Sequence, residues 1–230
     1  MPAQDWQGVA RIIDHTNLRP EATPSQIIQL CKEAREYGFG VVMVNACRIA
    51  LAHSHLQGSD VKIGAVVGFP LGATLTSVKR FEAAEALRLG AREIDMVLNI
   101  GALKAGDREF VRSDIEAVAE LVHGQNGLLK VILETGLLSD EEKRLACEIS
   151  EKAGADIVKT STGFLGGVAT VADVALMRRS VTIGVKASGG IRTASEALAM
   201  IAAGASRLGT SSGVNIIREL RAEFAGHKAK

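Results

Sequence analysis

The sequence alternates from end to end between short apolar segments rich in β-branched residues and longer segments with helical periodicity. The apolar segments predict strands over residues 10–14, 40–44, 62–68, 93–99, 129–134, 156–161, 182–188 and 206–210. Capping-box sequences beginning at Thr23, Ser139 and Thr193 precede three of the predicted helices. Eight strands alternating with eight helices, at about 29 residues per unit, match a (β/α)8 barrel. We therefore expect an α/β fold, a single TIM barrel domain over residues 1–230. An open doubly wound sheet is less favoured because no break in composition divides the units.

A short repeat aligns four of the predicted strands. In each copy a glycine ends a helix and a strand follows directly, at Gly38, Gly90, Gly154 and Gly204. The fifth residue after these glycines is Met43, Asp95, Lys159 and Gly209, respectively. Because alternate strands supply one interior layer, Asp95 and Lys159 are predicted to share a layer near the C-terminal ends of their strands, where barrel active sites lie. Two residues earlier lie Glu93 and Arg207, which we expect to pair across the interior, since neither charge can be buried alone.

Two lysines lie inside apolar strands, at the end nearest the following loops. Lys159 is part of DIVKTSTG, and Lys186 is part of TIGVKASGG. Burial and a second ammonium group both lower the pKa of a lysine, and imine formation with a carbonyl substrate requires a neutral amine. The alternative is that each lysine pairs with a carboxylate in a structural salt bridge. Two such lysines on consecutive strands favour the catalytic interpretation, without deciding which one is the nucleophile.

Two aspartates accompany these lysines. Asp95 lies in EIDMVLN, where its apolar neighbours leave it in need of a cationic or hydrogen-bonding partner. It is predicted either to act as a general acid and base or to serve only as the counter-ion of Lys159. Asp14 ends the first predicted strand and is either a second inward-facing candidate or a structural cap of the next turn.

Loops rich in glycine and hydroxyl groups follow the last two predicted strands. In a (β/α)8 barrel, loops at these positions commonly bind phosphate through backbone N–H groups and hydroxyl donors. The predicted phosphate-binding residues on these loops are Ser188, Gly189, Gly190, Gly209, Ser211 and Ser212, and Gly163 in the segment after Lys159 is predicted to join them.

Composition argues against several classes of partner. The 230 residues carry 27 Lys and Arg against 26 Asp and Glu, so neither nucleic acid nor a membrane surface is expected to bind. The longest apolar run, residues 63–73, is interrupted by Pro70, and no membrane span or targeting signal is predicted. Three widely spaced cysteines favour a reducing cytoplasm, and Cys47 is expected to be a small buried hydrophobic side chain rather than a nucleophile.

No metal or organic cofactor is expected. His53 and His55 are two residues apart on a predicted helix, so they do not share a face, and no cluster of histidines and carboxylates marks a metal site. No G-x-G-x-x-G sequence follows the first strand, which argues against dinucleotide binding.

Six segments resemble, in the same order, those of the deoxyribose-phosphate aldolases, a class I aldolase family. They are IDHTNLRPEAT (13–23), GAVVGFPLGA (64–73), EIDMVLNIGALK (93–104), VKTSTGF (158–164), GVKASGGIRT (184–193) and GTSSG (209–213). The resemblance covers nearly the whole chain, and the combination of KTSTG with VKASGG is its most specific part. It implies reversible cleavage of 2-deoxy-D-ribose 5-phosphate to D-glyceraldehyde 3-phosphate and acetaldehyde. It also implies a Schiff base without a metal, and a homodimer or higher homo-oligomer.

The resemblance assigns roles to the candidate residues. It makes Lys159 the Schiff-base lysine, and Lys186 the residue that perturbs its pKa and assists proton transfer. Asp95 becomes the proton donor and acceptor, working through water. Asp14 and Thr16 join the supporting catalytic network.

The chain departs from the family pattern in three places. Met43 and Ala46 replace a frequent cysteine and proline; that cysteine is associated with trapping by reactive aldehydes, so we expect resistance to this inactivation. After KTSTGF the glycines are shifted to Gly166 and Gly167, which predicts a change in the phosphate-side loop. Tyr37 is the only tyrosine, so the C-terminal tyrosine that helps proton abstraction in some members is expected to be missing.

Two other functions stay open on sequence alone. A different phosphosugar aldolase or isomerase on the same barrel would give other products, and acetaldehyde as the donor would separate the two. A non-catalytic phosphosugar-binding protein would need no neutral lysine, so Lys159, Lys186 and Asp95 argue against it.

Overall fold

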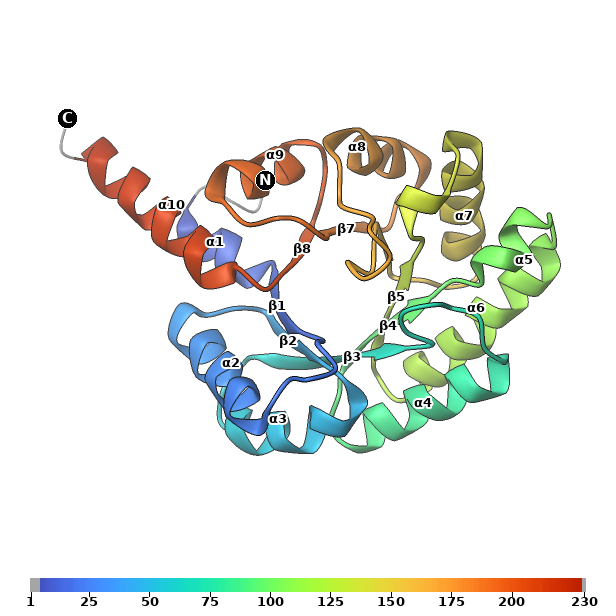
Figure 1. Cartoon of the computed structure of the whole chain (residues 1–230), viewed down its shortest axis with the longest axis horizontal. Coiled ribbons are helices and arrows are strands. Elements are labelled where there is room, and N and C mark those ends of the chain that lie inside the picture. Colours follow the sequence, from blue (N-terminus) through green and yellow to red (C-terminus); the bar gives the residue numbers. More distant parts are fainter. Residues whose placement is uncertain (1–4, 229–230) are drawn as a thin grey trace.

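Eight parallel strands form a closed barrel in which each strand pairs with the next and β8 pairs with β1 (Figure 1). The structure is a computed structural model that describes residues 5–228, with side chains as far as residue 224. The predicted (β/α)8 fold is confirmed. The predicted domain limits, residues 1 and 230, lie outside the described residues, and so do the side chains of the C-terminal residues 225–230.

The strands are short and follow one another at regular intervals along the chain. Their bounds are β1 Ile13–Asn17, β2 Val41–Val44, β3 Lys62–Val67, β4 Glu93–Val97, β5 Leu128–Ile132, β6 Ile157–Lys159, β7 Gly184–Ser188 and β8 Arg207–Thr210. All but the first lie within two residues of their predicted bounds. β1 begins three residues later than the strand predicted over 10–14.

The predicted start of β1 is wrong because the apolar residues before it belong to a helix. α1 (Trp6–Arg11) is capped by Asp5, whose Oδ1 accepts a hydrogen bond from the N–H of Gly8 at 2.7 Å. This helix buries Val9 and Ala10. A short apolar run does not by itself distinguish a strand from a buried helical turn, and here the Asp5 cap decides between them.

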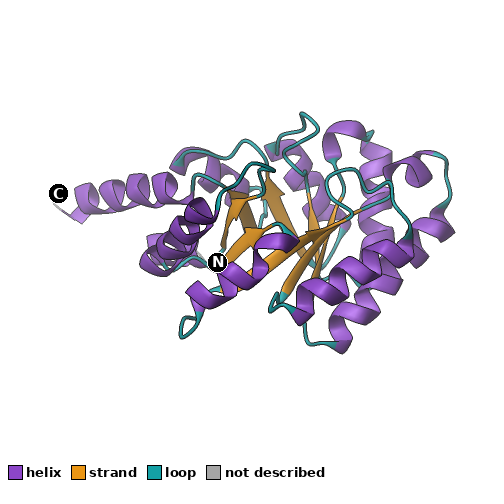
Figure 2. Ribbon diagram, turned by 60° about the horizontal axis from the view of Figure 1, so that its bottom comes forward, coloured by secondary structure: helices purple, strands orange, loops and turns teal. Residues whose placement is uncertain are grey.

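The helices surround the barrel and connect its strands (Figure 1, Figure 2). After α1, their bounds are α2 Pro24–Tyr37, α3 Ile49–Leu56, α4 Thr76–Arg88, α5 Ile100–Lys104, α6 Arg108–Gly124, α7 Asp140–Lys152, α8 Val171–Ser180, α9 Ala194–Ala202 and α10 Gly213–Lys228. Two 3-10 turns, η1 (Ala46–Arg48) and η2 (Thr135–Leu137), follow β2 and β5. Residues 5–228 thus hold two α-helices more than the eight expected, because α1 precedes the first strand and the short α5 precedes α6.

Local sequence explains where several helices begin and which face they bury. The predicted capping boxes are present: the side chains of Thr23, Ser139 and Thr193 each accept from the third residue of α2, α7 and α9. In α6 the side chains of Val111, Ile115, Val118 and Val122 lie on one face at a spacing of three or four residues, and this face is buried. The caps determine where these helices begin, and the apolar face packs α6 against the barrel.

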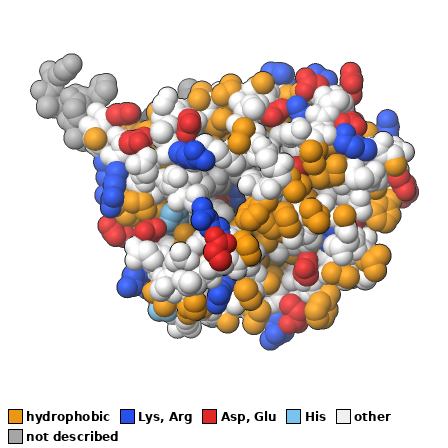
Figure 3. Space-filling view, viewed as in Figure 1, with side chains coloured by type: hydrophobic (Ala, Val, Ile, Leu, Met, Phe, Trp, Pro, Cys, Tyr) orange, Lys and Arg blue, Asp and Glu red, His pale blue; other side chains and the backbone are white. Residues whose placement is uncertain are grey.

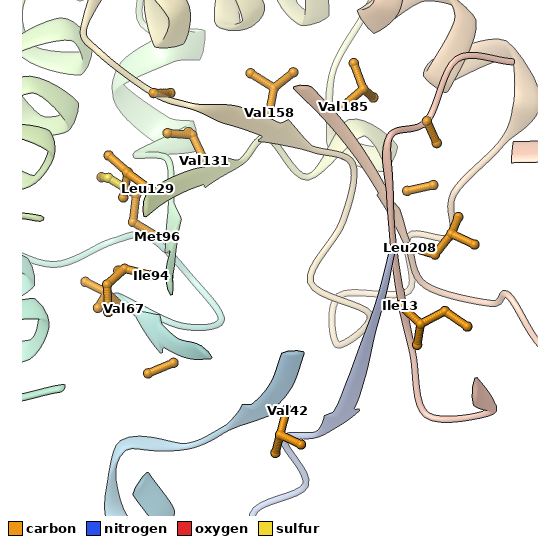
Figure 4. Close-up of a cluster of buried hydrophobic side chains, with 14 of the residues drawn as sticks. Ile13, Val42, Val67, Ile94, Met96, Leu129, Val131, Val158, Val185 and Leu208 are labelled. Atoms are coloured by element: carbon orange, nitrogen blue, oxygen red, sulfur yellow. The ribbon is translucent and has the colours of Figure 1, made fainter. Parts of the chain in front are cut away.

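Alternate side chains of the strands point outward and pack against the helices. Figure 4 shows ten of them, from Ile13 on β1 to Leu208 on β8, directed away from the centre of the barrel. Successive side chains of a strand face opposite ways, so the residues between them point inward. Asp14, Asp95 and Lys159 are among these inward-facing residues, and all three are buried.

α10 projects from the body of the molecule at its C-terminal end (Figure 2). The Arg221 guanidinium of α10 lies 3.9 Å from the ring centroid of Trp6. This cation–π contact packs α10 against α1. Within residues 5–228, no helix combines the length and the apolarity needed to cross a membrane.

Candidate active site

A cavity of about 670 Å³ lies at the C-terminal ends of the strands. The predicted site residues that line it are Thr16, Lys159, Gly163, Ser188, Gly189, Gly190, Gly209 and Ser211. Asp14, Asp95 and Lys186 are fully buried and do not line it. Ser212 does not line it either, and its backbone N–H donates to the hydroxyl of Thr210 at 2.8 Å.

Lys159, Lys186 and Asp95 are in direct contact. The Nζ atoms of Lys159 and Lys186 lie 2.9 and 2.8 Å from Oδ2 of Asp95. Register explains this contact, because Lys159 and Lys186 are paired neighbours on β6 and β7. The predicted shared layer of Asp95 and Lys159 is therefore confirmed. Lys186 also binds Oδ2 of Asp14, so Asp14 belongs to the same cluster rather than to a turn cap.

Lys130 was not among the predicted site residues, yet it lies inside this cluster. Its Nζ is 2.7 Å from Oδ1 of Asp95 and 2.7 Å from Oε2 of Glu93. On the barrel wall Lys130 pairs in register with Asp95. A lysine within an apolar strand is the signal that identified Lys159, and the same signal could have identified Lys130.

The predicted pair of Glu93 and Arg207 is confirmed in the layer beneath. Nη2 of Arg207 donates to Oε1 of Glu93 at 2.6 Å and contacts Oε2 as well. Nε of Arg207 also lies 3.2 Å from Oδ1 of Asp14, which joins the two layers. At the outer edge the exposed Lys62 approaches Glu93 to 3.9 Å.

Three carboxylates therefore meet four cations inside the barrel. The carboxylates are Asp14, Glu93 and Asp95, and the cations are Lys130, Lys159, Lys186 and Arg207. Buried charges are stable when they are paired, so this cluster is balanced once one cation loses its proton. Lys159 is the cation of the four that lines the cavity. Burial, opposed by Asp95 and reinforced by Lys186, lowers the pKa of Lys159 to about 8.

The pKa values of Lys130 and Asp95 shift in the directions that keep both groups charged. Burial acts to lower the pKa of Lys130, but Asp95, Asp14 and Glu93 outweigh it and raise that pKa. Burial likewise acts to raise the pKa of Asp95, but three lysines, Lys130 first, hold it well below its ordinary value. Asp95 is thus the shared counter-ion of three lysines. Its part in proton transfer stays a prediction.

The predicted phosphate-binding loops form one wall of the cavity. Gly163, Gly189 and Gly190 have φ values of 80°, 95° and 79°, a left-handed conformation that glycine adopts without strain. Ser188 fixes this wall to the neighbouring loop, since its Oγ donates to the carbonyl of Ser161 at 2.6 Å. The wall offers glycine amides and hydroxyl groups, and phosphate binding there stays a prediction.

A separate apolar cluster reaches the cavity through Leu18. Leu18, Val41, Met43 and Val66 form a buried cluster of their own, against which Phe69 packs. The ring of Phe164 meets that of Phe69 edge-on, with the centroids 5.1 Å apart. Figure 3 shows hydrophobic side chains gathered on this face over β3, β4 and β5. The cavity lining therefore combines polar residues of the loops after β7 and β8 with apolar side chains such as Leu18 and Phe164.

Cys47 differs from expectation, and His15 lines the cavity although the sequence assigned it no role. Cys47 is exposed, contrary to its expected burial, because η1 is a surface turn in which no side chain is buried. His15 lines the cavity and pairs with Glu33 of α2, with 2.7 Å between Nε2 and Oε2. Burial lowers the pKa of His15, and Glu33 opposes that effect. Thr16 donates its hydroxyl to the carbonyl of Asp14 at 2.8 Å.

Comparison with known proteins gives a single family. The family model for the DeoC/LacD family aldolases matches residues 9–219. The deoxyribose-phosphate aldolase of Thermococcus gammatolerans is 57% identical over 217 residues, which covers 93% of this chain and 96% of that protein. Deoxyribose-phosphate aldolase 1 of Bacillus licheniformis is 56% identical over 217 residues, covering 94% and 97%.

A solved structure agrees with these relatives. The deoxyribose phosphate aldolase of Aeropyrum pernix, described as a tetramer, superposes with a TM-score of 0.90 at 33% identity, covering 96% of this chain and 94% of that one. Sequence and structure thus match over nearly the same length. This chain belongs to the DeoC/LacD family of aldolases.

Proposed function

We propose that this protein catalyses the reversible cleavage of 2-deoxy-D-ribose 5-phosphate to D-glyceraldehyde 3-phosphate and acetaldehyde, in deoxyribose phosphate catabolism. The observation that carries the proposal is Lys159, the surplus cation of a buried cluster, which lines the cavity with a pKa of about 8. Such an amine is partly neutral at physiological pH and can attack a carbonyl carbon. The names of the relatives support this substrate.

The reaction begins when neutral Nζ of Lys159 adds to the C1 aldehyde of the open-chain sugar and water leaves, giving a protonated imine. Removal of the proton from the 3-hydroxyl then breaks the C2–C3 bond. The electron pair of that bond moves into the imine as an enamine, and glyceraldehyde 3-phosphate is released. Protonation of the enamine at C2, followed by hydrolysis, releases acetaldehyde and regenerates Lys159.

Asp95 and Lys186 are assigned to the proton transfers. The two side chains contact each other, and Asp95 contacts Lys159. A proton that leaves the substrate hydroxyl, or C2 in the reverse direction, therefore has a charged acceptor network beside it. The low pKa of Asp95 keeps that carboxylate ionised, which stabilises the imine cation as it forms. Asp14 holds Lys186 in place from the other side.

Different parts of the cavity orient the substrate. The phosphate is placed at the glycine- and hydroxyl-rich wall of residues 163, 188–190 and 209–211, where backbone N–H groups can approach an anion. The two carbons that become acetaldehyde are placed at Lys159, the lysine that lines the cavity. This placement puts the phosphate and the aldehyde of the substrate at different parts of the cavity.

We also propose that the protein is a cytoplasmic homo-oligomer. The tetramer described for the Aeropyrum pernix enzyme supports assembly, and α4 presents the exposed apolar side chains Leu75 (its N-cap), Val78 and Phe81. The cysteines Cys31, Cys47 and Cys147 are unpaired, which fits a reducing compartment.

Borohydride trapping tests the proposed chemistry. The protein is mixed with deoxyribose 5-phosphate or acetaldehyde and reduced, and peptide mass spectrometry locates the added mass. An adduct on Lys159 that disappears in Lys159→Leu supports the mechanism. An adduct on Lys186 would keep the aldolase reaction but exchange the two lysines. No adduct on a folded protein would refute imine chemistry and favour an isomerase or a binding protein.

A further inference from the structure

Glu134 has an unusual backbone conformation. It lies two residues after the end of β5, and η2 begins at the next residue. Its φ and ψ are 56° and 62°, in the left-handed region, and its side chain is fully buried. The only other non-glycine residue with positive φ among residues 5–228 is Asn126, and asparagine tolerates this conformation far better than glutamate. Strain of this kind persists when the surrounding contacts require it, and it is concentrated at functional sites.

The Glu134 carboxylate touches both ends of one loop segment, residues 162–168, which we call the strap. Oε2 accepts a hydrogen bond from the N–H of Thr162 at 2.9 Å. Oε1 faces Gly167, where an added Cβ would lie only 2.6 Å away. Within the described residues, no lysine, arginine or histidine forms an ion pair with this carboxylate, and Oε1 has no hydrogen-bond partner. The strap therefore folds around the buried Glu134 carboxylate, one oxygen of which has no hydrogen-bond donor among the described residues.

The strap in turn supports the predicted phosphate wall. The N–H of Ala169, next to the strap, donates to the carbonyl of Gly189 at 3.0 Å. An added Cβ on Gly189 would lie 3.1 Å from the carbonyl oxygen of Gly167, and one on Gly190 would lie 3.1 Å from Val168. Glu134 thus contacts the strap, and the strap in turn contacts Gly189 and Gly190. Gly166 and Gly167, the glycines that are shifted relative to the family pattern, lie in the strap.

We propose that Glu134 is a positioning residue for phosphate recognition: its carboxylate holds the strap in the shape that supports Gly189 and Gly190. Glu134 acts through the strap and does not touch the substrate. The inference rests on the proposed phosphosugar substrate, and it concerns the phosphate half of the site. Loss of the carboxylate weakens binding of the phosphate group more than it weakens the chemistry at Lys159.

Three variants test this role by two independent routes. Glu134→Ala removes the acceptor, whereas Glu134→Gln keeps an oxygen that can accept from Thr162. Gly167→Ala leaves Glu134 in the sequence but places a methyl group against Oε1, at a position whose φ is not left-handed. Glu82→Ala is the matched control, because Glu82 holds the N–H of Gly68 at 2.7 Å on another loop at the same end of the barrel.

The readouts separate phosphate binding from catalysis. Each variant is assayed with deoxyribose 5-phosphate and with unphosphorylated 2-deoxyribose, and its affinity for inorganic phosphate is measured by calorimetry. We expect Glu134→Ala and Gly167→Ala to lower kcat/KM for the phosphorylated sugar roughly 10-fold or more, mainly through KM, and to weaken phosphate binding by a similar factor. The loss with 2-deoxyribose is expected to be about fivefold smaller, and Glu134→Gln is expected to stay close to the parent protein.

Combining the two substitutions gives a further check. Glu134→Ala and Gly167→Ala disturb the same contact, so the double variant is expected to lose little more than either single variant. Equal losses with both sugars in a folded variant, or phosphate affinity unchanged, would overturn the proposal, as would Glu82→Ala showing the same phosphate-specific loss. If Glu134→Ala does not fold, the same comparison of the two sugars and of phosphate affinity is made with Gly167→Ala and Glu134→Gln. Failure of the proposed function looks different: the parent protein would not cleave deoxyribose 5-phosphate, while its phosphate affinity would still depend on Glu134.

Discussion

Substituting Lys130 tests the account of why Lys159 is partly neutral. Lys130 and Lys159 bind the two oxygens of the same carboxylate, with Nζ 2.7 Å from Oδ1 and 2.9 Å from Oδ2 of Asp95. In Lys130→Met one positive charge leaves the cluster. Three carboxylates then meet three cations with Lys159 still protonated, so the surplus that favours loss of its proton disappears.

The sign and the size of the effect follow from electrostatics. Removing a nearby positive charge favours the protonated amine, so the pKa of Lys159 rises from its value of about 8. At a separation of about 6 Å and an effective dielectric constant of about 20, the lost repulsion is roughly 3 kcal/mol, or about two pKa units. Allowing for relaxation around the cavity, we expect a rise of about one to two units. The neutral fraction of Lys159 at pH 7 then falls roughly 10- to 100-fold.

The assay is the rate of imine formation with acetaldehyde, trapped by cyanoborohydride, as a function of pH. The acid limb of the profile for Lys130→Met is expected to move upward by about one to two pH units, with most of the activity recovered at high pH. Lys79→Met is the control, since Lys79 is a fully buried lysine paired with Asp114 at 2.5 Å between α4 and α6. Lys79→Met leaves the buried carboxylate of Asp114 without its lysine, at a cost of roughly 3–5 kcal/mol in unfolding free energy. Lys130→Met costs less, because Asp95 keeps two lysines and Glu93 keeps Arg207. An unshifted acid limb in folded Lys130→Met, or an equal shift in Lys79→Met, would refute the charge-balance argument.

Three further predictions concern other parts of the molecule. Arg207→Met is expected to lower the unfolding free energy measured in urea by roughly 2–4 kcal/mol, because Glu93 loses its closest partner in the lower layer; an unchanged midpoint would contradict this. Burial lowers the pKa of His15 in the folded protein, so on acidification His15 is protonated in the unfolded state at a higher pH than in the folded state. The free energy of unfolding should therefore fall as the pH drops below about 6.5. A His15→Asn variant should show a flatter dependence of Tm on pH between 7.5 and 5.5, and an identical slope would exclude His15 as the cause. Met43→Cys should make the protein sensitive to unsaturated aldehydes, with a mass adduct at residue 43 and a time-dependent loss of activity that the parent protein does not show.

Much of the fold was predictable because local sequence carries it. Strand alternation determines which face each side chain takes, and the four helix-ending glycines set a common register for the strands that follow them. That is enough to place Asp95 beside Lys159 and Glu93 beside Arg207, and both pairs are present. The errors in the fold are local too. The start of β1 depended on whether a short apolar run was helix or strand, and the exposure of Cys47 depended on where the chain turns after β2.

The site needed more than local sequence. Periodicity identified two buried lysines but could not tell which one forms the imine. The charge balance of the cluster depends on side chains contributed by six different strands. Lys130 on β5 supplies the cation that puts positive charge in surplus. Its partners Asp95 and Glu93 lie 35 residues or more before it in the sequence. Glu134 likewise acquires its role from a loop that begins 28 residues later and folds back around its carboxylate. The sequence by itself determined the barrel and the inward direction of its charged residues, because alternation and helix ends are short-range properties. Only the tertiary structure decided which charge is in surplus and which carboxylate contacts the loop beside Gly189 and Gly190, because electrostatic and packing energies depend on distances that closure of the barrel alone sets.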